Sequence, residues 1–156
     1  MDGRATNMIA SDSLAPKVAR FEGCRLKAYR DAVGVWTIGF GNTTIDGRSV
    51  CEGDVITQEQ AEAMLARSIA YFAARLDAIA LKDGIRFSQN QFDALVSFAY
   101  NVGVAGCTRS DVWQACKEAR FEQAATLLLN HDHAGGKRLK GLTRRRQAES
   151  ALFATP

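Results

Sequence analysis

Two carboxylates and a hydroxyl near the start of the chain have the types and spacing that acid/base chemistry requires. Asp31 follows Glu22 by nine residues, and Thr37 follows Asp31 by six. A carboxylic acid that donates a proton and a second, ionised carboxylate are what hydrolysis of a bond such as a glycosidic linkage needs. Glu22, Asp31 and Thr37 are therefore the candidate catalytic set.

The residues before Glu22 predict a helix that ends at this position. Ser13 is a good N-cap, and Gly23 is a good helix-ending residue because glycine adopts left-handed backbone freely. Glu22 then lies in the last turn, where the negative end of the helix dipole disfavours an ionised carboxylate. A glutamic acid that keeps its proton there could act as a general acid.

The residues after Gly23 predict a small sheet. Ala28–Arg30 leads into a turn at Asp31–Gly34, and Val35–Gly41 alternates with β-branched and aromatic residues, as strands do. A second turn is indicated at Asp46-Gly47. This pattern places Asp31 beside a turn and Thr37 on the following strand.

Each of the three residues also has an ordinary structural explanation. Glu22 could be a solvated helix-end residue, and an aspartate before a turn commonly accepts hydrogen bonds from nearby backbone amides. Threonine is common in strands without any catalytic role. As functional groups, Asp31 would act as a base or a counter-charge, and the Thr37 hydroxyl would orient a water molecule.

The pattern of the remaining residues predicts helices. The capping boxes Thr57-x-x-Gln60 and Ser88-x-x-Gln91 begin two of them. The pattern then predicts a short helix opened by Thr108-x-x-Asp111, a helix at Phe121–Leu129, a loop at His131–Gly141 and a last helix from about Thr143 to Phe153. We expect a mostly helical, two-lobed α+β fold in a single domain of residues 1–156: a small N-terminal lobe with a β-sheet (13–56), a long connecting helix (57–81) and an all-helical C-terminal lobe (82–156).

Composition and charge bound the class of protein. The 156 residues are 47% hydrophobic and 24% charged, which is typical of a soluble globular domain. The net charge of +3 favours an anionic partner, either a bacterial wall polymer or a nucleic acid. No apolar run reaches the length of a secretory signal or a membrane span, so we expect accumulation in the cytoplasm of the producing cell and no stable membrane insertion.

Cysteine and histidine spacing argues against a metal site. Cys24, Cys51, Cys107 and Cys116 contain no CxxC pair, and we expect free thiols. His131-x-His133 has no further ligands at a suitable spacing. We expect neither a metal nor an organic cofactor.

The block around the candidate catalytic set carries a specific resemblance. It reads E-G-x-R-L-x-x-Y-x-D-x-x-G-x-x-T-I-G-x-G from Glu22 to Gly41 and closely resembles the phage-type lysozymes, the muramidases of bacteriophages. The resemblance continues through Gln91–Leu95, Asn101–Gly103, Ala134–Lys137 and Arg144-Arg145-Arg146-x-x-Glu149, and spans roughly residues 13 to 154.

This resemblance implies an endolysin that hydrolyses the β-1,4 bond between N-acetylmuramic acid and N-acetylglucosamine in peptidoglycan, with inversion at the anomeric carbon. Glu22 would be the proton donor, Asp31 the base or stabiliser, and Thr37 the residue that positions water. The saccharide would be contacted by Tyr100, Ser110 and Thr43, although Tyr100 could equally be a core aromatic, and Ser110 a helix cap.

The sequence departs from some relatives. Asn42 replaces a histidine, and no N-terminal membrane-tethering segment is seen. Asn42 removes any salt bridge built on that histidine but leaves the candidate catalytic set intact. The missing segment favours a soluble form that stays in the host cytoplasm until a separate membrane-permeabilising protein releases it to the periplasm and wall, and we expect this form to be a monomer. Cys24 lies near the site, so regulation by a cysteine is a further alternative beside a plain buried thiol.

Two other function classes remain open at this stage. A catalytically silent module could bind wall polymer or nucleic acid through a basic C-terminal segment containing Lys137, Arg138, Lys140 and Arg144–Arg146. Those cations could equally form a solvated helix face, and one arginine could pair with an acidic residue inside the helical lobe. A lytic transglycosylase would cut the same bond without water, but would leave Asp31 and Thr37 unexplained.

Overall fold

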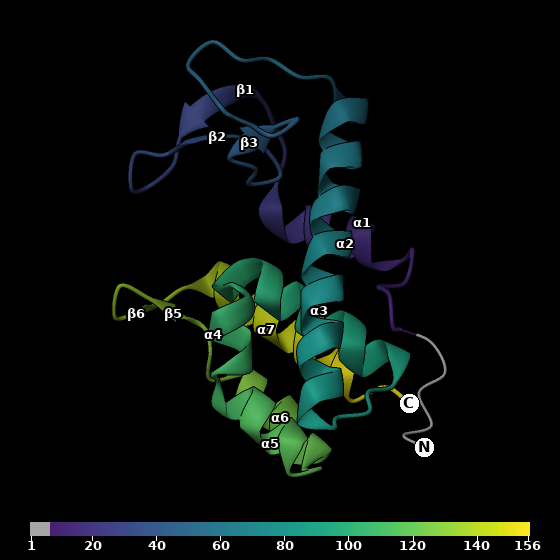
Figure 1. Ribbon diagram of the computed structural model, residues 1–156. Coiled ribbons are helices and arrows are strands. Elements are labelled where there is room, and N and C mark those ends of the chain that lie inside the picture. Colours follow the sequence, from purple (N-terminus) through teal and green to yellow (C-terminus); the bar gives the residue numbers. More distant parts are fainter. Residues whose placement is uncertain (1–6) are drawn as a thin grey trace. The chain divides into compact units, whose positions relative to one another are not determined.

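The computed structural model describes residues 7–156 and is mostly helical, with small two-stranded antiparallel sheets (Figure 1). Its chain divides into two compact units. The smaller unit is Ala15–Ile69. The larger unit is Ala70–Pro156, joined by the N-terminal segment that ends at Leu14. These features confirm the predicted α+β class.

The smaller unit contains the sheet elements that follow the first helix. In chain order they are α1 (Leu14–Glu22, whose first residue belongs to the larger unit), β1 (Arg25–Arg30), β2 (Trp36–Gly39), β3 (Thr44–Ile45), β4 (Arg48–Ser49) and the first part of α2 (Gln58–Asp83). Strands β1 and β2 form an antiparallel hairpin in which Tyr29 pairs with Thr37. β3 and β4 form a second hairpin.

Strand β1 is longer than the sequence predicted, because it pairs on both sides. Beyond its partner β2, it exchanges backbone hydrogen bonds with the segment that precedes α2. The amide of Ala28 donates to Asp54 O at 2.9 Å, and the amide of Ile56 donates to Leu26 O at 2.9 Å. This second partner is far along the sequence, so the local pattern could not indicate it.

The buried apolar side chains of the smaller unit come from α1, β2, α2 and the segments that join the strands and α2. They are Val18, Ile38, Phe40, Val50, Ile56, Ala61, Met64, Leu65 and Ile69. Gly39 has a φ of +66°, and a Cβ at this position would lie 3.5 Å from Ile56 Cδ1 and 3.8 Å from Ala61 Cβ. Glycine therefore suits both the backbone conformation and the close packing at the end of β2.

The larger unit is built mainly from helices. Its elements are the second part of α2, then α3 (Gln89–Val102), α4 (Val104–Thr108), α5 (Asp111–Lys117), α6 (Phe121–Leu128), β5 (His133–Ala134), β6 (Lys137–Arg138) and α7 (Lys140–Phe153). α7 packs against α3 and α6, and α5 packs against α6 (Figure 1). None of the helices in the described chain is both long and apolar enough to cross a membrane.

Both predicted capping boxes are present. Thr57 Oγ1 accepts from the amide of Gln60, whose side chain accepts from the amide of Thr57, and the same exchange joins Ser88 and Gln91. Reciprocal side-chain bonds of this kind satisfy amides that the first helical turn leaves unpaired. The local sequence was therefore sufficient to place these two helix starts.

Two local predictions in the larger unit were wrong. Thr108 ends the short helix α4, and Ser110 is the N-cap of α5 through a bond from the Trp113 amide. The predicted loop His131–Gly141 contains the hairpin β5–β6, and α7 begins at Lys140. Gly135 and Gly136 have φ values of +59° and +77°, as a tight two-residue hairpin turn requires.

Candidate active site

Glu22 is the last residue of α1, as the sequence predicted. Gly23 follows with a φ of +67°, and its amide donates to Ala19 O at 3.0 Å. The left-handed glycine stops the helix directly after Glu22. The half-buried carboxyl group of Glu22 therefore lies at the negative end of the helix dipole.

The loop after β2 brings backbone close to this carboxyl group. Ile38 and Asn42 form a bridge with two backbone bonds of 2.8 and 2.9 Å, which folds the chain back on itself. Gly41, inside this loop, has a φ of +87°, and a Cβ at this position would lie 3.7 Å from Glu22 Oε2. The loop therefore borders Glu22 without a side chain of its own at residue 41.

Asp31 is held by the turn between β1 and β2. Its Oδ1 accepts hydrogen bonds from the amides of Val33 at 3.0 Å and Val35 at 2.8 Å. Its own amide donates to Val35 O at 2.9 Å, and its carbonyl accepts from the Gly34 amide at 3.0 Å. Within the described chain, no donor reaches the other oxygen, Oδ2. These two backbone bonds fix the orientation of the carboxylate.

Thr37 lies on β2 and is 4% exposed. Its hydroxyl donates to Val35 O at 2.9 Å. Because a hydroxyl has one hydrogen, this bond leaves the Thr37 oxygen as an acceptor for any other partner. Asp31 and Thr37 are thus both bound to Val35, one through its amide and the other through its carbonyl.

The structure places the three candidate catalytic residues in the smaller unit, Asp31 and Thr37 on one hairpin and Glu22 directly before it. The arrangement offers a carboxyl group at a helix end and, on the hairpin, two oxygens that can accept hydrogen bonds. A carboxyl group can donate a proton to a leaving oxygen, and two acceptors can orient a water molecule. The side chains thus have the chemical capacity for acid/base hydrolysis.

The three predicted saccharide contacts lie in different parts of the chain. Thr43 is exposed in the smaller unit, and its carbonyl accepts from the Val50 amide. Tyr100 lies on α3 in the larger unit, with its ring 5.3 Å from that of Phe72. Ser110 has a structural role as the N-cap of α5. Their contact with substrate stays a prediction.

The sequence did not point to Val35, which occupies an unspecified position of the quoted motif. Gly41, by contrast, is one of the motif's glycines, and such a residue lets another backbone or a ligand come close. Val35 acts through its backbone groups, and Gly41 is notable for the absence of a side chain. The predicted turn at Asp31–Gly34 did indicate that nearby amides would donate to the Asp31 carboxylate, but not that Val35 would be one of the donors.

The two histidines do not form a metal site. His131 Nε2 lies 2.8 Å from Asp111 Oδ1, and His133 Nδ1 lies 2.9 Å from Asp132 Oδ1. Among residues 7–156 no group of three or more histidine, cysteine, aspartate or glutamate side chains is placed to hold a metal ion. All four cysteines are free thiols, as expected.

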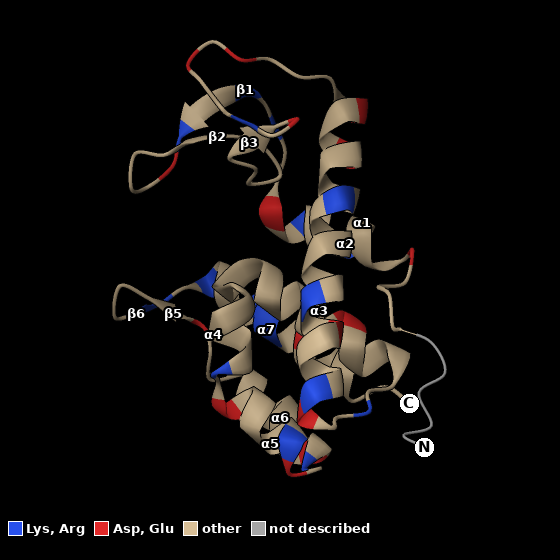
Figure 2. Ribbon diagram, viewed as in Figure 1, with Lys and Arg blue, Asp and Glu red and all other residues tan. Residues whose placement is uncertain are grey.

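Asp132 anchors the basic β5–β6 hairpin. Its side chain is 3% exposed and accepts from Arg138 Nε at 2.8 Å and from Thr143 Oγ1 at 2.7 Å. The hydrogen bond from the Thr143 hydroxyl lowers the pKa of Asp132 below its ordinary value, and the Arg138 guanidinium lowers it further. The exposed cations of the basic segment are Lys137, Arg138, Lys140 and Arg144, on the hairpin and the start of α7 (Figure 2).

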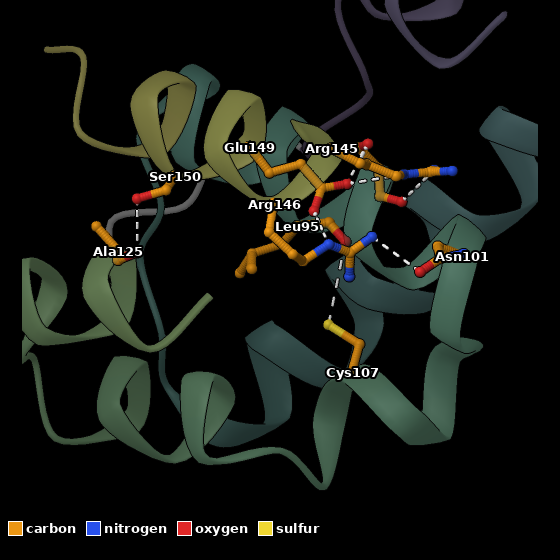
Figure 3. A network of polar contacts seen from close by, with 9 residues as sticks. Leu95, Asn101, Cys107, Ala125, Arg145, Arg146, Glu149 and Ser150 are labelled. Atoms are coloured by element: carbon orange, nitrogen blue, oxygen red, sulfur yellow. Dashed lines mark hydrogen bonds and ion pairs between the residues drawn. The ribbon is translucent and has the colours of Figure 1, made fainter. Parts of the chain in front are cut away.

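The other two arginines of this segment are buried in the larger unit (Figure 3). Arg145 Nε donates to Glu149 Oε2 at 3.1 Å. Arg146 Nε lies 2.9 Å from Glu149 Oε1, close enough for an ion pair although its N–H is not aimed at that oxygen. Arg146 also donates to Asn101 Oδ1 at 2.8 Å. The alternative of an internal arginine–carboxylate pair is therefore confirmed for Arg145 and Arg146.

Comparison with known proteins agrees with the fold and the motif. The model of the family described as phage lysozyme matches residues 19–149. The chain is 40% identical to an endolysin of Acyrthosiphon pisum secondary endosymbiont phage 1, over 87% of this chain and 91% of that protein. It is 38% identical to the endolysin of Bacillus phage B103. That match covers 88% of this chain and 51% of the longer phage protein.

A solved structure has the same fold. The muramidase domain of SpmX from Asticaccaulis excentricus superposes with a TM-score of 0.83 at 34% identity, covering 97% of this chain and all of that domain. Fold and sequence together define a lysozyme, a glycosidase that cleaves peptidoglycan. The chain belongs to the phage lysozyme family.

Proposed function

We propose that Glu22, Asp31 and Thr37 carry out the hydrolysis of the β-1,4 bond between N-acetylmuramic acid and N-acetylglucosamine. Glu22 donates its proton to the leaving glycosidic oxygen. Asp31 accepts a proton from the attacking water, and the Thr37 oxygen accepts the water's other hydrogen as a hydrogen bond. The observation that carries this proposal is a pair of bonds at Val35: its amide donates to Asp31 Oδ1, and its carbonyl accepts from the Thr37 hydroxyl, so that one hairpin presents two acceptors.

The proposed order of bonds is that of a single displacement. The water oxygen bonds to the anomeric carbon while the glycosidic C–O bond breaks, and the leaving oxygen takes the proton of Glu22. The water's proton passes to Asp31, so charge and atoms balance without a covalent enzyme intermediate. Attack from the face opposite the leaving group inverts the anomeric carbon.

Product analysis tests this mechanism. Purified peptidoglycan is digested, and the new glycan ends are identified by mass spectrometry. Hydrolysis predicts reducing ends, whereas a lytic transglycosylase leaves anhydro ends and a wall-binding module leaves no new ends. Anhydro ends would overturn the role of water, and with it those of Asp31 and Thr37. The anomeric configuration of fresh product, read by NMR, then separates inversion from retention.

We also propose that the protein acts as a monomeric endolysin that remains in the host cytoplasm until a separate protein permeabilises the membrane. The relatives named endolysins support this assignment. Expression in Gram-negative cells should leave turbidity unchanged until chloroform opens the inner membrane, after which turbidity should fall. Lysis during expression without chloroform would contradict the dependence on a permeabilising partner. Sedimentation of the purified protein checks for a monomer.

A further inference from the structure

Val35 bonds to both side chains that are proposed to handle the water. Its amide donates to Asp31 Oδ1 at 2.8 Å, and its carbonyl accepts from Thr37 Oγ1 at 2.9 Å. The same carbonyl accepts from the Asp31 amide at 2.9 Å. Asp31 and Val35 are thus joined by a reciprocal pair of bonds, and Thr37 is attached to that pair.

These bonds decide which atoms remain available for a water molecule. Oδ1 of Asp31 is bound by the amides of Val33 and Val35, and the described chain offers no donor to Oδ2. The Thr37 hydrogen points to Val35 O, so the Thr37 oxygen presents lone pairs. A water molecule that reached both oxygens could donate one hydrogen to each, with a lone pair of its own oxygen left to attack.

We propose that Val35 is a positioning residue that aligns Asp31 and Thr37 through its backbone amide and carbonyl. The inference rests on the proposed catalytic roles of these two residues. Aligned groups lower the barrier because the reacting geometry is set before the reaction begins. The amide holds the Asp31 carboxylate in one rotamer, and the carbonyl fixes the direction of the Thr37 hydroxyl.

The side chain of Val35 cannot account for this role. It is 44% exposed, and that of the neighbouring donor Val33 is 83% exposed, so neither contributes a buried packing contact of the usual size. The function of residue 35 therefore lies in its peptide groups. A change that removes the amide hydrogen while keeping the side chain is the appropriate probe.

The test replaces Val35 by its α-hydroxy acid analogue in cell-free synthesis. This change converts the amide between Gly34 and Val35 to an ester, which removes the N–H donor, weakens the Gly34 carbonyl as an acceptor and keeps the side chain. With soluble glycan strands as substrate, well below the unfolding temperature, we expect kcat to fall about 10- to 100-fold, the range for losing one hydrogen bond to a charged group. KM should change by less than about 3-fold, because binding of the glycan does not involve this bond.

A genetically encoded pair provides the matched comparison. Val35→Pro removes the same N–H, and Ala32→Pro places the same ring in the same turn, at its second position, where proline is favoured. The Ala32 amide has no hydrogen-bond partner among the described residues. We expect Ala32→Pro to keep its activity and Val35→Pro to lose it; if Val35→Pro does not fold, the ester variant alone decides.

Asp31→Asn, measured in parallel, separates the two levels of the claim. If Asp31→Asn keeps its activity, the proposed function of Asp31 is wrong and the role of Val35 falls with it. If Asp31→Asn is inactive but the ester variant has an unchanged kcat, the proposed function stands and the inference about Val35 is wrong. If the ester variant has a lower unfolding temperature but an unchanged kcat, the Val35 amide contributes to stability only, and the inference is again wrong.

Discussion

Gly41 lies against the carboxyl group of Glu22: a Cβ at residue 41 would be 3.7 Å from Glu22 Oε2. This distance is an ordinary van der Waals contact, so an alanine would fit, but it would place a methyl group beside the proposed acid. With a φ of +87°, residue 41 also has a backbone conformation that only glycine adopts without strain. The loop therefore gives the acid a neighbour made only of backbone.

Gly41→Ala should lower both stability and activity. Backbone strain should reduce the free energy of unfolding by about 1–2 kcal/mol, and the methyl group beside Glu22 should lower kcat on the order of 10-fold by displacing the reacting groups. Gly47→Ala is the matched control, since Gly47 has a φ of +85° and open space around its Cβ position. Thermal unfolding and wall lysis measure the two effects. Equal lysis rates for both variants would show that proximity to Glu22 has no consequence.

Asp132→Asn should destabilise the protein in a pH-dependent way. The folded-state pKa of Asp132 is lowered by Thr143 and Arg138, so its charge stabilises the fold above the ordinary carboxylate pKa of about 4. That contribution is lost as the pH falls through the lowered folded-state value. The unfolding-temperature difference between wild type and variant should be largest near neutral pH and shrink below about pH 4. The exposed Asp12→Asn serves as control, and a difference that stays constant down to strongly acidic pH would refute this account.

Glu149→Ala should be among the most destabilising substitutions in α7. It leaves the buried cations of Arg145 and Arg146 without the carboxylate that both contact, and breaking a buried pair costs about 3–5 kcal/mol. Denaturant unfolding measures the loss. The neighbouring exposed Gln147→Ala should change stability by less than about 0.5 kcal/mol.

A double variant tests the cause of that loss. Arg146→Met combined with Glu149→Leu removes the closest ion pair but fills the space with apolar groups. It should be less destabilised than Glu149→Ala alone, because no uncompensated Arg146 charge remains. If the double variant is equally unstable or worse, the unpaired charge of Arg146 does not explain the effect.

The four thiols should fall into two classes of reactivity. Cys51 is exposed and Cys24 half-buried, whereas Cys107 and Cys116 are buried. Burial raises the pKa of Cys116 to about 12 and also raises that of Cys107, so both remain in the unreactive thiol form. A disulfide reagent at mildly alkaline pH should label Cys51 first, and Cys107 and Cys116 only after unfolding. Rapid native labelling of Cys116, found by peptide mass spectrometry, would contradict the buried assignment.

The sequence predicted those features that are encoded locally. Gly23 placed Glu22 at a helix end, and the two capping boxes placed the starts of α2 and α3. The alternation around Thr37 predicted β2 and its hairpin. Each of these signals lies within a few residues of the feature that it determines, so no tertiary information was needed.

Features that depend on distant partners were not predictable in the same way. β1 gains length from residues 54–56, and Asp132 is joined to α7 through Thr143, eleven residues away. The sequence left open whether an arginine of this segment is buried, and the bonds of Arg145 and Arg146 to residues of α3 decide it for both. Backbone roles such as that of Val35 escape a reading based on side-chain types, because any residue except proline has the same N–H.

The central claim is that Glu22 supplies the proton, and Glu22→Gln tests it most directly because glutamine keeps the shape and cannot donate that proton. The measurement is the release of reducing ends from purified peptidoglycan, with unfolding temperature as the check on folding and the exposed Glu52→Gln of the same unit as control. The rate for Glu22→Gln should fall about 10²- to 10⁴-fold, while Glu52→Gln retains the wild-type rate. A folded Glu22→Gln variant that releases reducing ends at close to the wild-type rate would contradict the account.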